Sequence, residues 1–287
     1  MTSRVTFIGG AAWLALAAAG GGAGWIIPTP AAAQTSPSRP ATSGPAPPEP
    51  LPTPPVPPRI AEGADYDRCL DQVETDPVGA AAFADAWEAT GGGEGAAHCH
   101  ALAMVEQGDA GEGAERLQAL AAGSRAPAPA RAAVFGQAAR AWLLAGDAGR
   151  SYAAATLALA LVPDDADASI ARANAAANME RYQDAVDDLG RALDFAPRRA
   201  DALVLRGAAW RHLGQLDLAQ DDVDRALDAE PDNPEALLER GILRQRRGDP
   251  AGARADWQRA AELAPDTPAG ELARQNLALL DAGPERR

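Results

Sequence analysis

Apolar residues return at helical spacing through the second half of the chain. Between residues 200 and 233, Leu203 and Trp210 are seven residues apart, and Ala219 and Val223 are four apart. Spacings of three, four and seven place side chains on one face of an α-helix. The pattern therefore predicts two amphipathic helices in this stretch, each with one apolar stripe.

This pair of helices repeats with a fixed period. Pro163, Pro197, Pro231 and Pro265 follow one another at a constant interval, and proline ends a helix because it cannot continue the hydrogen bonding. Gly214 and Gly248 occupy the equivalent turn between the two helices, where a left-handed residue is favoured. Small residues mark the predicted close approach of the paired helices. They form three columns, namely Ala173, Gly207 and Gly241, then Ala185, Ala219 and Ala253, then Ala192, Ala226 and Ala260.

These positions resemble the tetratricopeptide repeat (TPR), a helix–turn–helix unit whose length equals the interval between the prolines, most clearly over residues 166–267. The resemblance implies an all-α fold, a right-handed superhelical solenoid of antiparallel helix pairs, with about six pairs and a C-terminal capping helix. Two family positions are not kept. The large residue early in the first helix is Ser169 in one unit, and the aromatic eleventh residue, Trp210 in one unit, is Ala176 and Arg244 in the others. We expect thinner packing at these places.

The repeat signal weakens towards the N-terminus and divides the chain into segments. An insertion from Ser124 to Ala130, which contains Pro127 and Pro129, is expected to separate weak repeats from clear ones. The predicted segments are a signal peptide at 1–33, a proline-rich disordered linker at 34–61, degenerate helical repeats at 62–131, TPR units at 132–165, 166–199, 200–233 and 234–267, and a capping helix with a tail at 268–287.

The segment 1–33 has the pattern of an export signal. Arg4 precedes an apolar run from Val5 to Ile27, and Ala31 to Ala33 supply a small-residue cleavage site. The alternative is an uncleaved membrane anchor, since the apolar run is long enough to span a bilayer. Cleavage predicts a periplasmic or secreted protein without stable membrane insertion.

Eleven prolines lie between residues 37 and 58. Proline lacks an amide donor and fixes φ, which favours an extended spacer of roughly 3 Å per residue. The predicted role is a stalk that holds the folded part away from the membrane. The alternative is a ligand for a proline-binding groove.

Composition excludes several functions. The net charge is −14, which disfavours non-specific binding to nucleic acid or to an anionic membrane surface. All 26 basic residues are arginine, so no lysine is available for a phosphate loop or a Schiff base. The three histidines stand in no motif with a nucleophile and an orienting acid. We therefore expect no enzyme activity and no cofactor.

Cys69 and Cys99 are the only cysteines. In an exported protein two cysteines usually form one disulfide, which predicts a bridge between them. The alternative is a metal site made by His98, Cys99 and His100. Successive residues on a helix point about 100° apart, which disfavours binding of one ion by all three.

Arginine and aspartate recur together in the repeat. Arginines occupy the seventh place of three units and aspartates the twenty-third. We predict one structural ion pair between the two helices of each unit, and not a ladder that binds charged ligands. The pairs are Arg172 with Asp188, Arg206 with Asp222, and Arg240 with Asp256.

In TPR proteins the first helices line a concave groove that binds partners, and the resemblance assigns six residues of this chain to it. Their amide and guanidinium groups suit a peptide backbone or a carboxylate, which favours a peptide partner with some acidic character. We expect a non-enzymatic protein–protein interaction scaffold of the bacterial periplasm or cell envelope. The alternative is a receptor that binds a small ligand or a glycan in the same groove. The six residues are Asn174, Asn178, Arg211, His212, Gln245 and Arg246.

Overall fold

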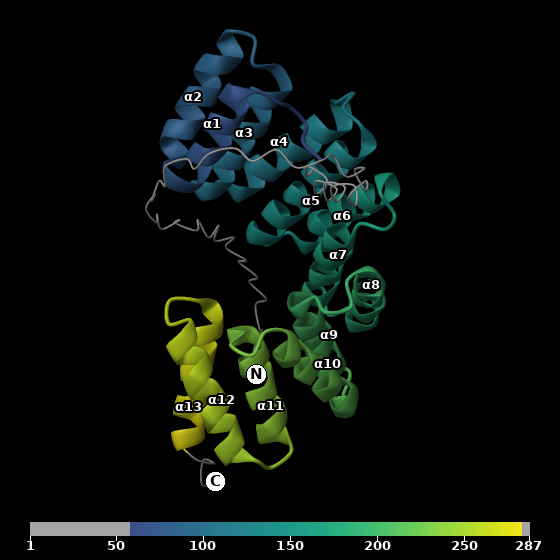
Figure 1. Cartoon of the computed structure of the whole chain (residues 1–287), viewed down its shortest axis with the longest axis vertical. Helices are drawn as coiled ribbons and strands as arrows, with labels where there is room; N and C mark the ends of the chain where they lie inside the picture. Colours follow the sequence, from purple (N-terminus) through teal and green to yellow (C-terminus); the bar gives the residue numbers. More distant parts are fainter. Residues whose placement is uncertain (1–57, 283–287) are drawn as a thin grey trace, which may run out of the picture. The chain divides into compact units, whose positions relative to one another are not determined.

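The computed structural model describes residues 58–282, and the predicted signal peptide and most of the proline-rich linker lie outside this range. The described residues contain helices and no strand (Figure 1). None of these helices combines the length and the apolar character that crossing a membrane requires. The helices are α1 (Ala64–Thr75), α2 (Pro77–Ala89), α3 (Gly93–Glu106), α4 (Ala110–Gly123), α5 (Ala128–Leu144), α6 (Ala148–Leu161), α7 (Ala166–Asn178), α8 (Tyr182–Phe195), α9 (Ala200–His212), α10 (Leu216–Ala229), α11 (Pro234–Arg246), α12 (Pro250–Leu263) and α13 (Pro268–Ala282).

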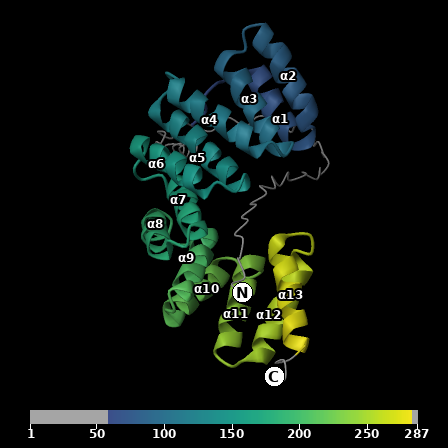
Figure 2. The same ribbon diagram turned by 180° about the vertical axis from the view of Figure 1, so that it is seen from behind.

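Consecutive helices pack as antiparallel pairs, which confirms the predicted all-α repeat solenoid. Six pairs run from α1/α2 to α11/α12, and α13 packs on the last pair as the predicted cap. Both views show α11, α12 and α13 side by side (Figures 1 and 2). The first helices of successive units also contact one another, α5 with α7, α7 with α9, α9 with α11, and α11 with α13.

One predicted boundary was wrong. Helix α5 already begins at Ala128, so the connection after α4 is shorter than the expected insertion from Ser124 to Ala130. Pro129 lies within the first turn of α5. Proline is tolerated there because the amide groups of a first turn have no partner inside the helix.

The turn inside each unit requires a left-handed residue. Gly146, Gly214 and Gly248 have φ of 78°, 78° and 82° and close the first helices of their units. In the unit 166–199 the equivalent residue is Glu180, with φ of 61°. A side chain in this conformation clashes with its own backbone, whereas glycine does not.

The small-residue columns lie where the paired helices meet. Ala185, Ala219 and Ala253 are fully buried, and so are the three alanines seven residues further on. A Cβ on Gly207 would lie 2.9 Å from Val223 Cγ2, closer than real side chains approach. The columns therefore set how near the helices can come.

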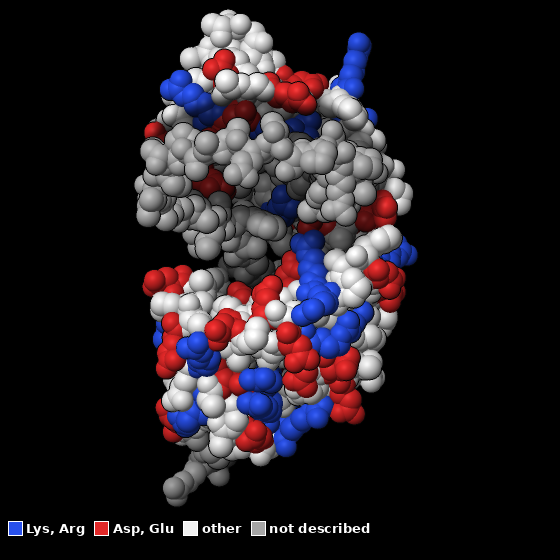
Figure 3. All heavy atoms as spheres, in the orientation of Figure 1, with Lys and Arg blue, Asp and Glu red and all other residues white. Residues whose placement is uncertain are grey.

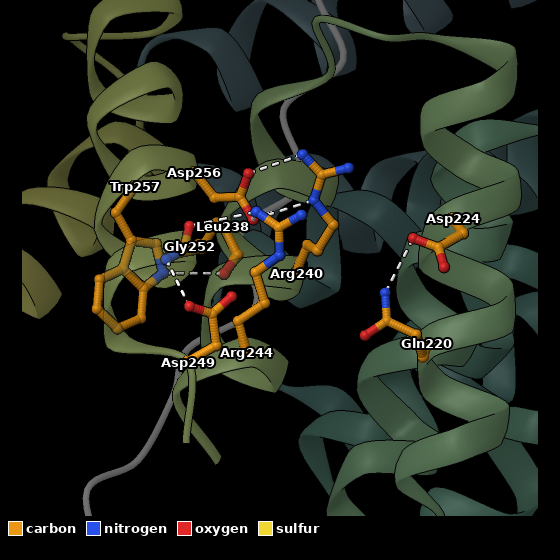
Figure 4. A network of polar contacts seen from close by, with 9 residues as sticks. All are labelled: Gln220, Asp224, Leu238, Arg240, Arg244, Asp249, Gly252, Asp256 and Trp257. Atoms are coloured by element: carbon orange, nitrogen blue, oxygen red, sulfur yellow. Dashed lines mark hydrogen bonds and ion pairs between the residues drawn. The ribbon is translucent and has the colours of Figure 1, made fainter. Parts of the chain in front are cut away.

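In the last full unit the contact between the two helices includes a larger residue. Trp257 is fully buried against Gly241, where a Cβ would overlap the indole ring. The indole Nε1 donates to the Leu238 carbonyl at 3.1 Å (Figure 4). Trp257 thus fills space in the unit whose eleventh residue is Arg244 and not an aromatic. Arg244 instead contacts Asp256 at 2.8 Å.

The predicted arginine–aspartate pairs are present in all three units. Each is bidentate; Arg206 Nε and Nη2 both lie 2.7 Å from the oxygens of Asp222. The aspartates are buried, and Asp222 is only 2% exposed. The hydrogen bonds to Asp222 raise the pKa of Arg206. Because a buried carboxylate needs a partner, these pairs hold the two helices in register. The other two pairs are Arg172 with Asp188 and Arg240 with Asp256.

A disulfide joins Cys69 of α1 to Cys99 of α3, which confirms the predicted bridge. The two histidines beside Cys99 contact different partners. His98 contacts the Tyr66 hydroxyl and the Gln137 side-chain oxygen, each at 2.6 Å, and His100 lies 3.2 Å from Asp85. Neither imidazole joins Cys99, so the metal alternative does not hold. Burial lowers the pKa of His98, which keeps it neutral.

Replacing Glu180 tests the strain in its turn. We expect Glu180→Gly to raise the free energy of unfolding by about 0.5–1 kcal/mol, since the relief of strain exceeds the greater backbone entropy that glycine loses. Chemical denaturation measures this difference. Gly214→Ala, at the same place of the next unit, should lower stability by about 1 kcal/mol, and a destabilised Glu180→Gly would contradict the assignment.

Removing one arginine tests the ion pairs. Arg206→Ala should lower the free energy of unfolding by about 3 kcal/mol, because it leaves the buried Asp222 carboxylate without its main partner. The matched control is Arg191→Ala, at an exposed arginine of α8, which should change stability by less than about 0.5 kcal/mol. Equal stability of the two variants in urea would mean that the pair is not structural.

Removing the disulfide tests its role as a clamp on α1 to α3. Cys69→Ala with Cys99→Ala should cost about 3–4 kcal/mol, the value for a closed loop of this length. Hydrogen exchange should show the loss first in α1 and α3. Thiol titration of the unreduced, denatured chain should find no reactive thiol, and two reactive thiols would refute the bridge.

Candidate functional site

The six residues assigned to the groove all lie near the C-terminal ends of first helices. Asn174 and Asn178 belong to α7, Arg211 and His212 to α9, and Gln245 and Arg246 to α11. Since α7, α9 and α11 pack side by side, these ends follow one another along one face. We call it the first-helix face. Leu144, Asn178, His212 and Arg246 occupy the same thirteenth place of successive units and form a row along it.

The Asn178 side chain is held against its own helix. Asn178 is exposed, and its Nδ2 donates to the Asn174 carbonyl at 2.9 Å. This bond orders the Asn178 side chain and leaves its Oδ1 as an acceptor. One unit earlier, the row continues with Leu144, which is 61% exposed.

Arg211 is buried and does not face solvent. Its guanidinium forms an ion pair with Glu239 of α11, and the exposed fractions of the two side chains are only 6% and 8%. The pair joins the first helices of two successive units. Arg211 therefore lies buried beneath the first-helix face, whereas the resemblance implies that it faces a ligand. Glu239 was not identified from the sequence because it has no counterpart in the other units.

His212 is held between an aromatic ring and this buried pair. Its ring stacks on Tyr182 of α8, with centroids 4.3 Å apart and an interplanar angle of 10°. Its Nε2 lies 3.3 Å from Arg211 Nη2. Because arginine only donates, we assign Nε2 as the acceptor and place the imidazole proton on Nδ1. Tyr182 was not identified from the sequence either, since the other units have no aromatic at its place.

The surroundings of His212 are electropositive. Partial burial, and then the charges of Arg211 and Arg246, lower its pKa to about 4. His212 is therefore neutral at physiological pH. Arg246 follows His212 at the same place of the next unit, and α9 and α11 contact each other.

Gln245 and Arg246 complete the cluster on α11. Both are exposed, and within residues 58–282 neither side chain makes a hydrogen bond or an ion pair. Many other arginines of the C-terminal units are paired with acids, as Arg247 is with Asp217 at 2.7 Å. Over the C-terminal helices, Figure 3 shows basic and acidic side chains interspersed. The C-terminal helices therefore carry no broad field of one sign in this view.

The cluster offers mainly hydrogen-bond donors. The Nδ1–H of His212, the Gln245 amide and the Arg246 guanidinium match ligands that accept, such as a peptide carbonyl or a carboxylate. The opposite ends of the first helices carry acids, among them Asp167 and Asp201, which Arg199 bridges. Acids at helix N-termini and bases at C-termini also complement the helix dipoles. Within the described range no three metal-binding side chains are grouped to hold an ion.

Known proteins share the fold but not the sequence. No protein-family model matches the chain, and a search of curated proteins finds no match. TTC0263, a thermophilic TPR protein of Thermus thermophilus, superposes with a TM-score of 0.55 at 20% identity, over 66% of this chain and 99% of that one. The APC/C hetero-tetramer Cut9–Hcn1 gives a TM-score of 0.58 at 13% identity, over 75% of this chain and 45% of that one. The protein therefore has the fold of tetratricopeptide-repeat solenoids.

Proposed function

We propose that the protein is a non-enzymatic interaction scaffold of the bacterial periplasm or cell envelope, which binds a peptide segment of another protein on its first-helix face. The supporting observation is the cluster of His212, Gln245 and Arg246. Gln245 and Arg246 are exposed and His212 is partly exposed, on a face that continues from one unit to the next. An extended segment offers regularly spaced acceptors to such a row.

One structural observation and one sequence prediction support the envelope location. The disulfide between Cys69 and Cys99 suits an oxidising compartment. The export signal is a prediction from residues 1–33, which lie outside the described range. The proline-rich linker, most of which also lies outside it, would serve as the spacer between the envelope and the solenoid.

The buried pair of Arg211 with Glu239 limits which substitutions can test the proposal. Arg211→Glu would place a carboxylate against the buried Glu239 and destabilise the fold, so a loss of binding would say nothing about the face. Gln245 and Arg246 are exposed, and their side chains make no hydrogen bond or ion pair to other described residues. Their replacement should leave stability within about 0.5 kcal/mol.

Charge reversal of the exposed cluster tests peptide binding. We expect Gln245→Glu with Arg246→Glu to lower the amount of partner captured from the native envelope at least about tenfold, since two donors become acceptors. Arg191→Glu, at an exposed arginine of the second helix α8, is the matched control and should retain the partner. Quantitative mass spectrometry of the captured proteins measures both. Capture that is equal in all three proteins would dismiss the first-helix face.

A further inference from the structure

We propose that Tyr182, His212, Gln245 and Arg246 form a subsite for an aspartate or glutamate side chain of the bound segment, and that His212 takes up a proton when this carboxylate binds. The inference rests on the proposed function and adds a regulation to it. Binding should therefore strengthen as the surroundings become mildly acidic.

The geometry holds the imidazole in a fixed plane. The stack on Tyr182 covers one side of the ring, and the guanidinium of Arg211 faces its Nε2. Arg211 is itself held by Glu239 on the neighbouring helix. The ring therefore directs Nδ1–H to a position where no described side chain accepts it.

The charges around His212 leave one cation uncompensated. On α9, Arg211 is neutralised by Glu239 of α11. Tyr182, in the first turn of α8, adds no negative charge, because burial and then the charge of Glu180 raise the pKa of its hydroxyl. Arg246 of α11 has no acidic partner within residues 58–282. A single negative charge beside His212 and Arg246 would balance the cluster. A carboxylate also accepts hydrogen bonds from both groups, as well as from the Gln245 amide.

The row of thirteenth-place residues indicates a side chain and not a chain terminus. Asn178 and Leu144 continue it on one side of His212, and α13 packs beyond α11 on the other. A segment lying along the face would therefore pass through the subsite, and its acidic residue would be internal.

Proton uptake follows from the same charges. In the free protein burial and two guanidiniums hold the pKa of His212 at about 4. A bound carboxylate cancels part of the positive potential and raises this pKa, so the complex binds a proton more readily than the free protein does. The proton adds to Nε2, which then no longer accepts from Arg211 Nη2, and the imidazolium keeps its Nδ1–H for the carboxylate. By linkage, affinity rises as the pH falls. A rise of about 1.5–2 pKa units on binding gives about four- to tenfold tighter binding at pH 5 than at pH 7.

Fluorescence anisotropy with a defined probe tests the proposal. The probe is a labelled decapeptide of alternating glutamate and alanine with both ends blocked, and the full chain is titrated with it between pH 7 and pH 5. We expect its affinity to increase about four- to tenfold over this range. The matched peptide with glutamine in place of glutamate should bind at least about tenfold more weakly at each pH.

Variants show whether the imidazole of His212 causes the pH dependence of binding. His212→Gln should abolish the pH dependence, which also controls for protonation of the peptide itself. Arg246→Gln should weaken binding at every pH, and Arg191→Gln should behave as the unmodified chain does. Binding that does not change with pH, or a rise that persists in His212→Gln, overturns the proton uptake, and absence of binding to the acidic peptide overturns the carboxylate subsite. A natural partner captured through Gln245 and Arg246 would still support the proposed function in either case.

Discussion

The close approach of the two helices in each unit is the contact on which the other features depend. Three columns of glycine and alanine permit it, and Ala185, Ala219 and Ala253 are completely buried there. With so little side chain between the backbones, the distance between the helices cannot change without loss of dispersion contacts. The pair of Gly241 and Trp257 shows the same constraint in another form, since a large ring is accommodated only where the opposite residue has no side chain.

Contacts between small apolar residues bring the helices together but do not strongly determine their register. The buried charge pairs fix the register here. An aspartate at the helix interface must meet its arginine, because an unpaired buried carboxylate is costly. The pairs inside units align first helix with second helix. The pair of Arg211 with Glu239 acts between units and fixes one first helix against the next.

This pairing also shapes the candidate site. Because Glu239 neutralises Arg211, the charge presented to solvent at that end of the first-helix face is that of Arg246. His212 lies at the boundary, stacked on Tyr182 and half-buried, so its protonation is sensitive to any charge that arrives. The structural role of one arginine thus sets the chemical character of the neighbouring position.

The sequence by itself determined what recurs. The constant interval between the prolines, the turn glycines and the arginine–aspartate pairs appear in several units, and each copy supports the interpretation of the others. The single pair of cysteines likewise left one possible bridge. Only the tertiary structure decided the contacts that occur once, such as Arg211 with Glu239 and Tyr182 with His212, whose partners belong to different units. The helices of successive units contact one another regularly, but these two residue pairs have no counterpart in other units, so periodicity cannot reveal them.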